Sequence, residues 1–429
     1  MIEMKKILVI VLIAALVQTI VISFLNLEIV KDAKRYDRIA VNVSKGLGLS
    51  EDGKNPSWLH AGAPLMFGGV YVVFGHHPKA VKIFQAILFC LLCVLIYAIG
   101  VRCFNANIGF ISGIVCAIYP PLFILPSILL SEFLFTAMLS ITLFFYILST
   151  KRDSNLVYGI TGMLSAYLGC IRPNGLFLIF FLIAGAIFLF KDKKRYLRFA
   201  IISFVFFIIF MLPITFRNYV QFGKFTPIAG METVSVIEVT DEQATKINEF
   251  SEGLSKRQFI LTKSYYEKAG IDLEEGELRK ELKGFMGKIV PQDYTWRPKN
   301  LIDSIRRLYI GSYSDIYQIG IPLAFFLKDR RLISEYPGLF IWKCLLLSLS
   351  ALVLFASLLG FLFGLRKFIE LLPIYLFIGY NTLFYLTYAF KFKTDLTTRY
   401  GLPVLPYLII FAVYAVTFII NKLRGVRNA

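Results

Sequence analysis

Long apolar segments separated by short polar connections run through most of this chain. A helix needs about 20 apolar residues to cross the hydrocarbon core of a bilayer. Ten segments approach or reach that length, at residues 5–25, 80–100, 107–125, 128–149, 156–171, 175–190, 198–216, 340–363, 369–390 and 402–421. The fifth and sixth are short enough to tilt, or to re-enter the membrane from one side. The pattern predicts an all-α polytopic membrane protein with about ten transmembrane helices.

Basic residues in the short connections predict how these helices are oriented, because Lys and Arg gather on the cytoplasmic side of membrane proteins. Such residues occur at Lys5 and Lys6, at Arg102, at Lys151 and Arg152, in the cluster from Lys191 to Arg198, at Arg366 and Lys367, and at Lys422, Arg424 and Arg427. These positions follow alternate segments. Both termini are therefore expected in the cytoplasm, and the protein in the cytoplasmic (inner) membrane.

The outer, periplasmic side then receives residues 26–79, the turns near 126 and 173, the long segment 217–339 and residues 391–401. This division predicts an N-terminal transmembrane module, 1–216, with the outer loop 26–79, and C-terminal transmembrane helices in 340–429.

The segment 217–339 is the only sizeable polar stretch in the sequence. Residues 241–290 are rich in Glu, Lys and Leu at helix-like spacing, and residues 299–309 have the pattern of a short amphipathic helix. Loops of this length without any structure of their own are uncommon in compact proteins. The segment is predicted to form a small helical exterior subdomain.

The composition agrees with this fold class and limits the classes of partner and cofactor that we expect. Hydrophobic residues make up 57% of the chain and the net charge is +18. The basic residues lie along the edges of apolar segments, which suits orientation in a membrane and contact with anionic lipid better than nucleic acid. The chain has no GxxxxGK[ST] loop, no GxGxxG after a strand and no DxD pair. We expect membrane lipid as a partner, and neither nucleic acid nor a nucleotide cofactor.

Glu132 is the most unusual polar residue on physical grounds. Ser127 is a plausible N-cap, so Glu132 is predicted to lie roughly 7 Å into the fourth span. A carboxylate at the membrane centre costs about 2.5–3.5 kcal/mol on insertion scales, and less near the edge. Such a residue usually faces a cavity or a partner. The alternative is an interfacial Glu whose side chain reaches the membrane surface.

Asp32 and three arginines are predicted at the same outer face as Glu132. Asp32 follows the first span, where a charged residue is also typical of a solvated flank. Arg172 lies in an outer turn, Arg217 at the outer end of the seventh span and Arg399 just before the last span. Each arginine alone could anchor to lipid headgroups. Together they indicate a site for an anionic headgroup, since Arg binds phosphate through two parallel hydrogen bonds.

His60 is the histidine closest to these acids along the outer loop. With Asp32 and Glu132 it could complete a divalent metal site, although the chain contains no HExxH motif and no Cys/His spacing typical of zinc.

The ordered set of motifs resembles the polytopic C-type (GT-C) glycosyltransferases that use polyprenyl-phosphate sugars, such as lipid A aminoarabinose transferases and protein O-mannosyltransferases. The resemblance covers the chain except about 230–295, and Ala33 replaces the second acid that the family often has. The family's basic residue before Pro-Pro-Leu is absent, and His60 could substitute for it. The motifs are Asp32–Ala40, Gly46-Leu47-Gly48, Gly62-Ala63-Pro64-Leu65, Val73-Phe74-Gly75, Tyr119-Pro120, Ser131-Glu132, Ile171-Arg172-Pro173, Arg217-Asn218-Tyr219 with Phe222-Gly223, and Arg399-Tyr400 with Pro403.

This resemblance implies inverting transfer of one sugar, hexosyl or pentosyl, from a polyprenyl-phosphate donor to a hydroxyl of an envelope glycan, glycolipid or protein. Asp32 would be the general base in a catalytic first outer loop, with Glu132 as the second catalytic acid. A divalent cation could be held by Asp32, Glu132 and His60. The residues implied to bind the donor phosphate or substrate are Lys34, Arg35, Tyr36, His60, Arg172, Arg217, Arg399 and Tyr400.

Two other functions fit a chain with many spans and a large outer segment. An O-antigen polymerase or ligase depends mainly on outer-loop arginines and has no particular need of an acid after the first span. A lipid-linked sugar flippase or transporter is expected to carry charges near the middle of the membrane, whereas the ionisable residues here are predicted at one face.

Overall fold

The computed structural model of this chain describes residues 2–25, 29, 32–57, 59–223, 225–227, 298–311, 323–328, 330–392, 396 and 398–425. These residues are mostly helical, and they contain no β-strand beyond one isolated bridge between Ser50 and Pro56. The helical fold follows from the apolar composition, because a backbone inside a membrane must satisfy its own hydrogen bonds.

The α-helices are α1 (Ile2–Phe24), α2 (Asp32–Ser44), α3 (Gly62–Phe74), α4 (Pro78–Cys103), α5 (Ala106–Ile118), α6 (Pro120–Phe123), α7 (Ser131–Lys151), α8 (Asn155–Ile171), α9 (Pro173–Leu176), α10 (Leu178–Leu189), α11 (Lys193–Phe222), α15 (Pro298–Tyr309), α17 (Leu323–Lys328), α18 (Arg331–Glu335), α19 (Pro337–Gly364), α20 (Phe368–Phe392) and α21 (Leu405–Leu423). The 3-10 helices are η1 (Leu125–Ser127), η2 (Leu365–Lys367), η3 (Thr398–Tyr400) and η4 (Leu402–Val404).

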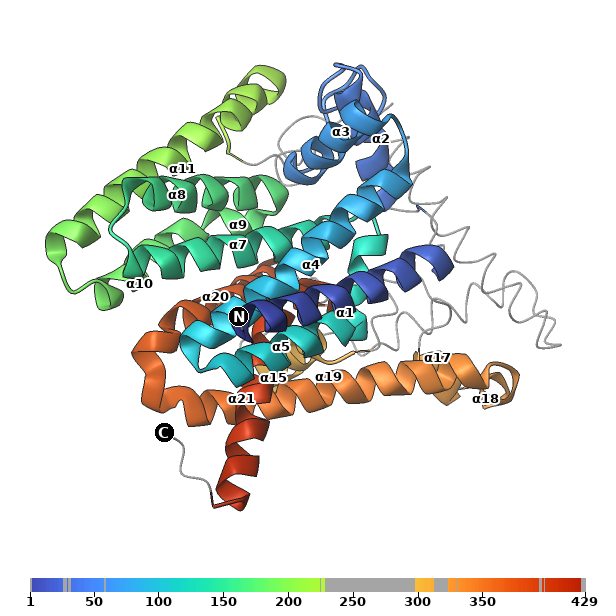
Figure 1. Cartoon of the computed structure of the whole chain (residues 1–429). Helices are drawn as coiled ribbons and strands as arrows, with labels where there is room; N and C mark the ends of the chain where they lie inside the picture. Colours follow the sequence, from blue (N-terminus) through green and yellow to red (C-terminus); the bar gives the residue numbers. More distant parts are fainter. Residues whose placement is uncertain are drawn as a thin grey trace.

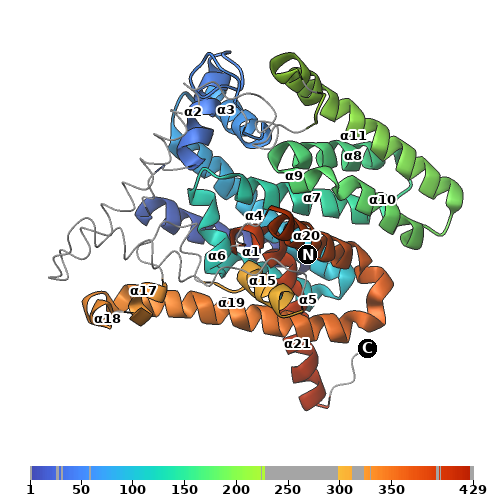
Figure 2. The same cartoon turned by 180° about the vertical axis from the view of Figure 1, so that it is seen from behind.

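Most of the long apolar helices lie side by side as a bundle (Figure 1). Helices α2 and α3 lie at the same end as α17 and α18, while the α7–α8, α10–α11 and α19–α20 connections lie at the opposite end (Figures 1 and 2). These three connections carry basic residues predicted to be cytoplasmic, namely Lys151 and Arg152, the cluster from Lys191 to Arg198, and Arg366 and Lys367. The fold therefore separates the two sets of connections that the charge pattern separates.

All ten predicted membrane segments coincide with helices of the structure. By length and composition, six helical stretches in the described part of the chain could cross a membrane, or seven if a bent pair counts as one span. One of the six is the 54-residue stretch Pro337–Phe390, which contains both α19 and α20. The structure is thus an all-α polytopic membrane protein, while the number of ten crossings stays a prediction.

The segment between α5 and α7 is broken rather than continuous. Helices α5 and α6 meet at an angle of 62° where two prolines interrupt the run. Two buried glutamines bind the carbonyl groups that the break leaves without helical partners. Gln18 Nε2 donates to Phe123 O at 2.8 Å, and Gln85 Nε2 donates to the carbonyls of Pro126 and Ile128 at 3.0 and 3.1 Å. Irregular backbone at membrane depth is stable when protein groups satisfy it in this way.

The predicted start of the fourth span is wrong. Ser127 ends η1 and its hydroxyl donates to Ile124 O at 2.6 Å, whereas α7 begins at Ser131 after the extended residue Leu130. Glu132 is therefore in the first turn of α7, where a carboxylate also interacts favourably with the helix dipole.

The segment 26–79, predicted to be an outer loop, contains two helices, α2 and α3, that the hydrophobic pattern does not predict. Helix α3 is apolar but only 13 residues long, too short for the spanning rule. It packs on α2 at Gly68, where a Cβ would lie 2.6 Å from a methyl group of Val43. The absence of a side chain allows the two helices to approach closely, so α3 holds α2 in place.

The predicted amphipathic helix at 299–309 is confirmed as α15, which packs against α20 and η3. The predicted helical region 241–290 lies outside the described residues.

Candidate active site

A buried ion-pair network surrounds Glu132. The residue is 0% exposed, yet its Oε1 forms an ion pair with Arg172, whose Nη1 lies 2.9 Å away, and accepts a hydrogen bond from Arg399 Nε. A buried carboxylate is strongly unfavourable unless charges and hydrogen bonds compensate it. The two arginines supply that compensation, so Glu132 points at partners rather than at the membrane surface.

The same Arg399 also binds the carboxylate that follows the first span. Arg399 Nη1 donates to Asp32 Oδ2 at 3.0 Å. The side chain of Asp32 is 41% exposed and that of Arg399 28% exposed, in contrast to the buried Glu132. Arg399 therefore bridges the partly exposed carboxylate of Asp32 on α2 and the buried carboxylate of Glu132 on α7.

The second acid of α2 faces a different helix. Asp37 Oδ1 accepts a hydrogen bond from the Tyr71 hydroxyl at 2.5 Å, and Asp37 Oδ2 lies 3.1 Å from His76 Nε2. Asp37 thus fastens α2 to α3. Of the two acids on α2, only Asp32 joins the network around Glu132.

Local backbone geometry directs Arg172 at Glu132. Arg172 ends α8 with φ −151° and ψ 145°, and Pro173 follows it. A residue before proline is pushed out of the helical region by contact with the proline ring. This extended residue turns the chain between α8 and α9.

Tyrosine rings line the same network. Tyr36 lies one turn after Asp32 on α2 and is buried beside Ser131 and Glu132. Burial, and then the negative charge of Glu132, raise the pKa of the Tyr36 hydroxyl, which stays protonated as a hydrogen-bond donor. The guanidinium of Arg172 lies 5.8 Å from the ring centre of Tyr400, and Tyr400 stacks on Tyr385 at 4.7 Å.

A pair of buried amides connects the two turns that carry the arginines. Asn174 Nδ2 donates to Asn381 Oδ1 at 3.1 Å, and Asn381 Nδ2 donates to the carbonyl of Tyr400 at 3.3 Å. The hydroxyl of Tyr380 donates to the carbonyl of Asn174. Helix α20 therefore holds the turn after Arg172 and the turn around Arg399 in register.

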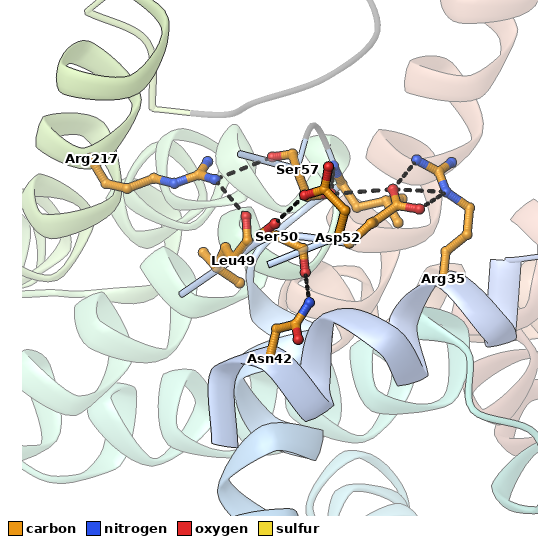
Figure 3. A network of polar contacts seen from close by, with 9 residues as sticks. Arg35, Asn42, Leu49, Ser50, Asp52, Ser57 and Arg217 are labelled. Atoms are coloured by element: carbon orange, nitrogen blue, oxygen red, sulfur yellow. Dashed lines mark hydrogen bonds and ion pairs between the residues drawn. The ribbon is translucent and has the colours of Figure 1, made fainter. Parts of the chain in front are cut away.

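Two of the residues predicted to bind substrate have protein partners in the structure, and a third is exposed. Arg35 forms an ion pair with Glu51, its Nη2 2.6 Å from Oε1. Arg217 Nη2 donates to the carbonyls of Leu49 and Ser57 at 3.1 and 3.3 Å (Figure 3). Lys34 is exposed on α2.

His60 lines a small pocket whose wall includes Arg217, Asn218 and Cys170. The described residues contain no group of three or more His, Cys, Asp and Glu side chains arranged to hold a metal ion. Asp32 and Glu132 are instead joined by a guanidinium. As placed, these side chains fit an ion-pair network rather than the three-ligand set predicted from sequence, so no chemical step is assigned to a metal.

Comparison with known proteins adds family and fold. A family model described as dolichyl-phosphate-mannose-protein mannosyltransferase matches residues 62–214, a region that includes Glu132 and Arg172. A comparison with curated protein sequences gives no match.

The chain is similar in structure to an oligosaccharyltransferase of Archaeoglobus fulgidus. The apo form aligns with a TM-score of 0.56 at 13% identity, over 99% of this chain and 52% of that one. The complex of the archaeal enzyme, AglB, with an inhibitory peptide and a dolichol-phosphate aligns with a TM-score of 0.56 at 14% identity, over 99% of this chain and 52% of AglB. A complex with Zn and sulfate gives 0.54 at 13%, over 97% and 50%. The chain spans about half the length of that protein.

These similarities confirm the resemblance noted in the motifs at the level of the fold. The chain has the GT-C fold of membrane-embedded glycosyltransferases.

Proposed function

We propose that this GT-C-fold membrane protein is a glycosyltransferase that moves one hexosyl or pentosyl unit from a polyprenyl-phosphate donor to an acceptor hydroxyl. The acceptor would belong to an envelope glycan, a glycolipid or a protein at the outer face of the cytoplasmic membrane. The matching family model is named for a dolichyl-phosphate-mannose enzyme, and one of the similar structures binds a dolichol-phosphate. Both names support a lipid-phosphate donor here.

One observation carries the proposal: Asp32 is an accessible carboxylate directly beside a buried Glu–Arg–Arg network. A general base must reach the proton that it removes. Asp32 is 41% exposed, whereas Glu132 is buried and bound by two arginines. Asp32 is therefore the general base, and Glu132 orients the arginines.

The reaction follows from these positions. Asp32 accepts the proton of the acceptor hydroxyl while the acceptor oxygen forms a new bond to the anomeric carbon of the sugar. The bond between that carbon and the phosphate oxygen breaks on the opposite face, so the anomeric configuration inverts. Polyprenyl phosphate leaves with the bonding electron pair. The proton remains on Asp32 until it passes to water.

Charge develops on the departing phosphate, and positive side chains placed in advance stabilise such charge. Arg399 is the better candidate for this contact, because its side chain is 28% exposed while that of Arg172 is 10% exposed. Tyr400 and the exposed Lys34 complete the proposed donor side. The apolar helices around the site suit the isoprenoid tail of the donor.

The test compares the envelope glycans and glycolipids of cells with and without the gene by mass spectrometry. Loss of one hexosyl or pentosyl unit on deletion is expected, with restoration by the wild-type gene. Asp32→Asn should restore about 10²- to 10⁴-fold less product, the usual contribution of a positioned base.

Asp37→Asn is the matched control, because Asp37 lies on the same helix but contacts Tyr71 and His76. It should restore the product when both variants accumulate equally in membranes. Full activity of Asp32→Asn would remove Asp32 as the base. Loss of whole glycan chains instead of one sugar would indicate a polymerase or ligase, and altered sidedness of the donor lipid would indicate a flippase.

A further inference from the structure

Residues 45–57, which we call the Glu51 loop, fold back over helix α2. Arg217 on α11 binds one side of the loop through the carbonyls of Leu49 and Ser57. Asn42 on α2 binds the other side, its Nδ2 donating to the carbonyl of Ser50 at 2.8 Å. Figure 3 shows these contacts holding the loop between α2 and α11.

The loop brings Glu51 to Arg35 of α2. Arg35 Nε donates to both carboxylate oxygens of Glu51, at 3.0 and 3.2 Å, and its Nη2 donates to Oε1 at 2.6 Å. This two-pronged contact is the stronger geometry for an Arg–carboxylate pair. The two side chains are 26% and 29% exposed, so water screens the pair only in part.

Arg35 also stands one helical turn from Asp32. Residues three apart on a helix are neighbours on its surface, and an Asp–Arg pair at this spacing attracts. Glu51 and Asp32 are thus two carboxylates within reach of one guanidinium. In the structure the guanidinium is on Glu51.

We propose that Glu51 is a positioning residue for the sugar transfer, which holds the guanidinium of Arg35 away from Asp32. The inference rests on the proposed function, because it requires Asp32 to act as the base. Arg217 and Asn42 take part by fixing the loop that carries Glu51.

The charges around Asp32 explain why the position of the Arg35 guanidinium affects the strength of Asp32 as a base. Among the described residues, the charged and titratable groups of this cluster are Arg35 and Tyr36 on α2, Glu51 in the loop, Arg399 in η3, Glu132 on α7 and Arg172 at the end of α8. Arg399 already binds Asp32, but it shares its charge with Glu132. A second arginine paired with Asp32 alone would stabilise its ionised form and make it a weaker base.

The experiment uses three variants of the full chain: Glu51→Gln, Arg35→Gln and the double variant. Each is expressed in gene-deleted cells, and membranes are isolated with the cells' own donor lipid and acceptor. The initial rate of product formation is measured by mass spectrometry across pH. Membrane content of each variant is measured in parallel.

Glu51→Gln releases Arg35 toward Asp32. The rate is expected to fall about tenfold, and the acidic limb of the pH–rate profile to move down by about one pH unit, within the range for an acid beside an arginine. Arg35→Gln lacks the competing cation, so its profile keeps the wild-type position. The double variant should match Arg35→Gln within about twofold and should exceed Glu51→Gln.

Rescue separates this role from a structural one. If Glu51 only holds the loop in place, removing Arg35 as well cannot restore the rate, and the double variant will be as slow as Glu51→Gln. That result, or an unmoved acidic limb in Glu51→Gln, overturns the inference. If Asp32→Asn is active in the same assay, the proposed base fails. If Asp32→Asn is inactive while Glu51→Gln is normal, only the role of Glu51 fails.

Discussion

At the scale of single residues, Glu132 shows how one buried charge organises a site. Its two partners come from distant parts of the sequence, Arg172 from the end of α8 and Arg399 from η3. Because neither arginine can lose its charge in a protein, the carboxylate is what makes their close approach possible. Glu132 therefore sets both the position of the arginines and the charge available to a phosphate.

Glu132→Gln is expected to lower stability and activity together. Removing one partner of a buried ion pair costs about 3–5 kcal/mol, because the other charge stays uncompensated. The melting temperature should fall by several degrees in detergent. A thiol-reactive dye can report unfolding, since Cys93, Cys103, Cys116 and Cys170 are buried.

The double variant Glu132→Gln with Arg172→Gln separates the two effects. It removes the uncompensated charge, so much of the lost stability should return, while sugar transfer should stay low. Recovery of transfer along with stability would contradict a role for this pair in the site. Ser140→Ala is a control on the same helix, because Ser140 is buried and binds the hydroxyl of Tyr407.

Some residues of the site can be predicted from the sequence, and others cannot. Charges in an apolar context are conspicuous, so Asp32, Glu132 and the arginines could be picked out. Tyr385 and Asn381 stand in an aromatic-rich helix and have no distinguishing pattern. Arg217, predicted to bind substrate, donates to Asn218 Oδ1 of its own motif and also to the backbone carbonyls of Leu49 and Ser57, and no side-chain motif reveals the latter contacts.

At the scale of elements, close packing of α8 on α11 depends on a glycine. A Cβ added at Gly162 would overlap the carbonyl oxygen of Ser203 on α11. Small residues allow membrane helices to approach closely and gain van der Waals contact. This contact positions α8, and with it Arg172 at its end.

Gly162→Ala is expected to destabilise the protein by about 1–3 kcal/mol, the usual cost of overpacking. Gly379→Ala is the matched control, because Gly379 is an exposed helical position on α20 with open space around it. There the change should be neutral or slightly stabilising, since alanine favours a helix more than glycine. Equal melting temperatures of the two variants would argue against tight α8–α11 packing.

Helix positions were predictable where the apolar run alone determines them, and less so at their ends. All ten predicted segments match helices, but the start of α7 was placed too early. The break before α7 depends on Gln18 and Gln85, which lie on other helices and accommodate an irregular backbone. Helix α3 was missed because it is held by contact with α2 rather than by length.

At the scale of the whole molecule, orientation decides where the site meets its substrates. The basic connections around Lys194 lie at one end of the bundle, and α2, α3 and the Glu51 loop lie at the other (Figure 1). The positive-inside rule assigns the end with the basic connections to the cytoplasm. A polyprenyl-phosphate sugar and an envelope acceptor can meet Asp32 only if the end with α2, α3 and the Glu51 loop faces outward.

Cysteine labelling tests this orientation directly. Lys54 in the Glu51 loop and Lys194 at the start of α11 are both exposed, so Lys54→Cys and Lys194→Cys should both leave the fold intact. With the cytoplasmic membrane sealed, a membrane-impermeant maleimide should label Lys54→Cys and leave Lys194→Cys unlabelled. Permeabilisation should then expose Lys194→Cys, with the wild-type chain as the background control. The reverse pattern would put Asp32 on the cytoplasmic side, and a donor delivered to the outer leaflet could not reach it.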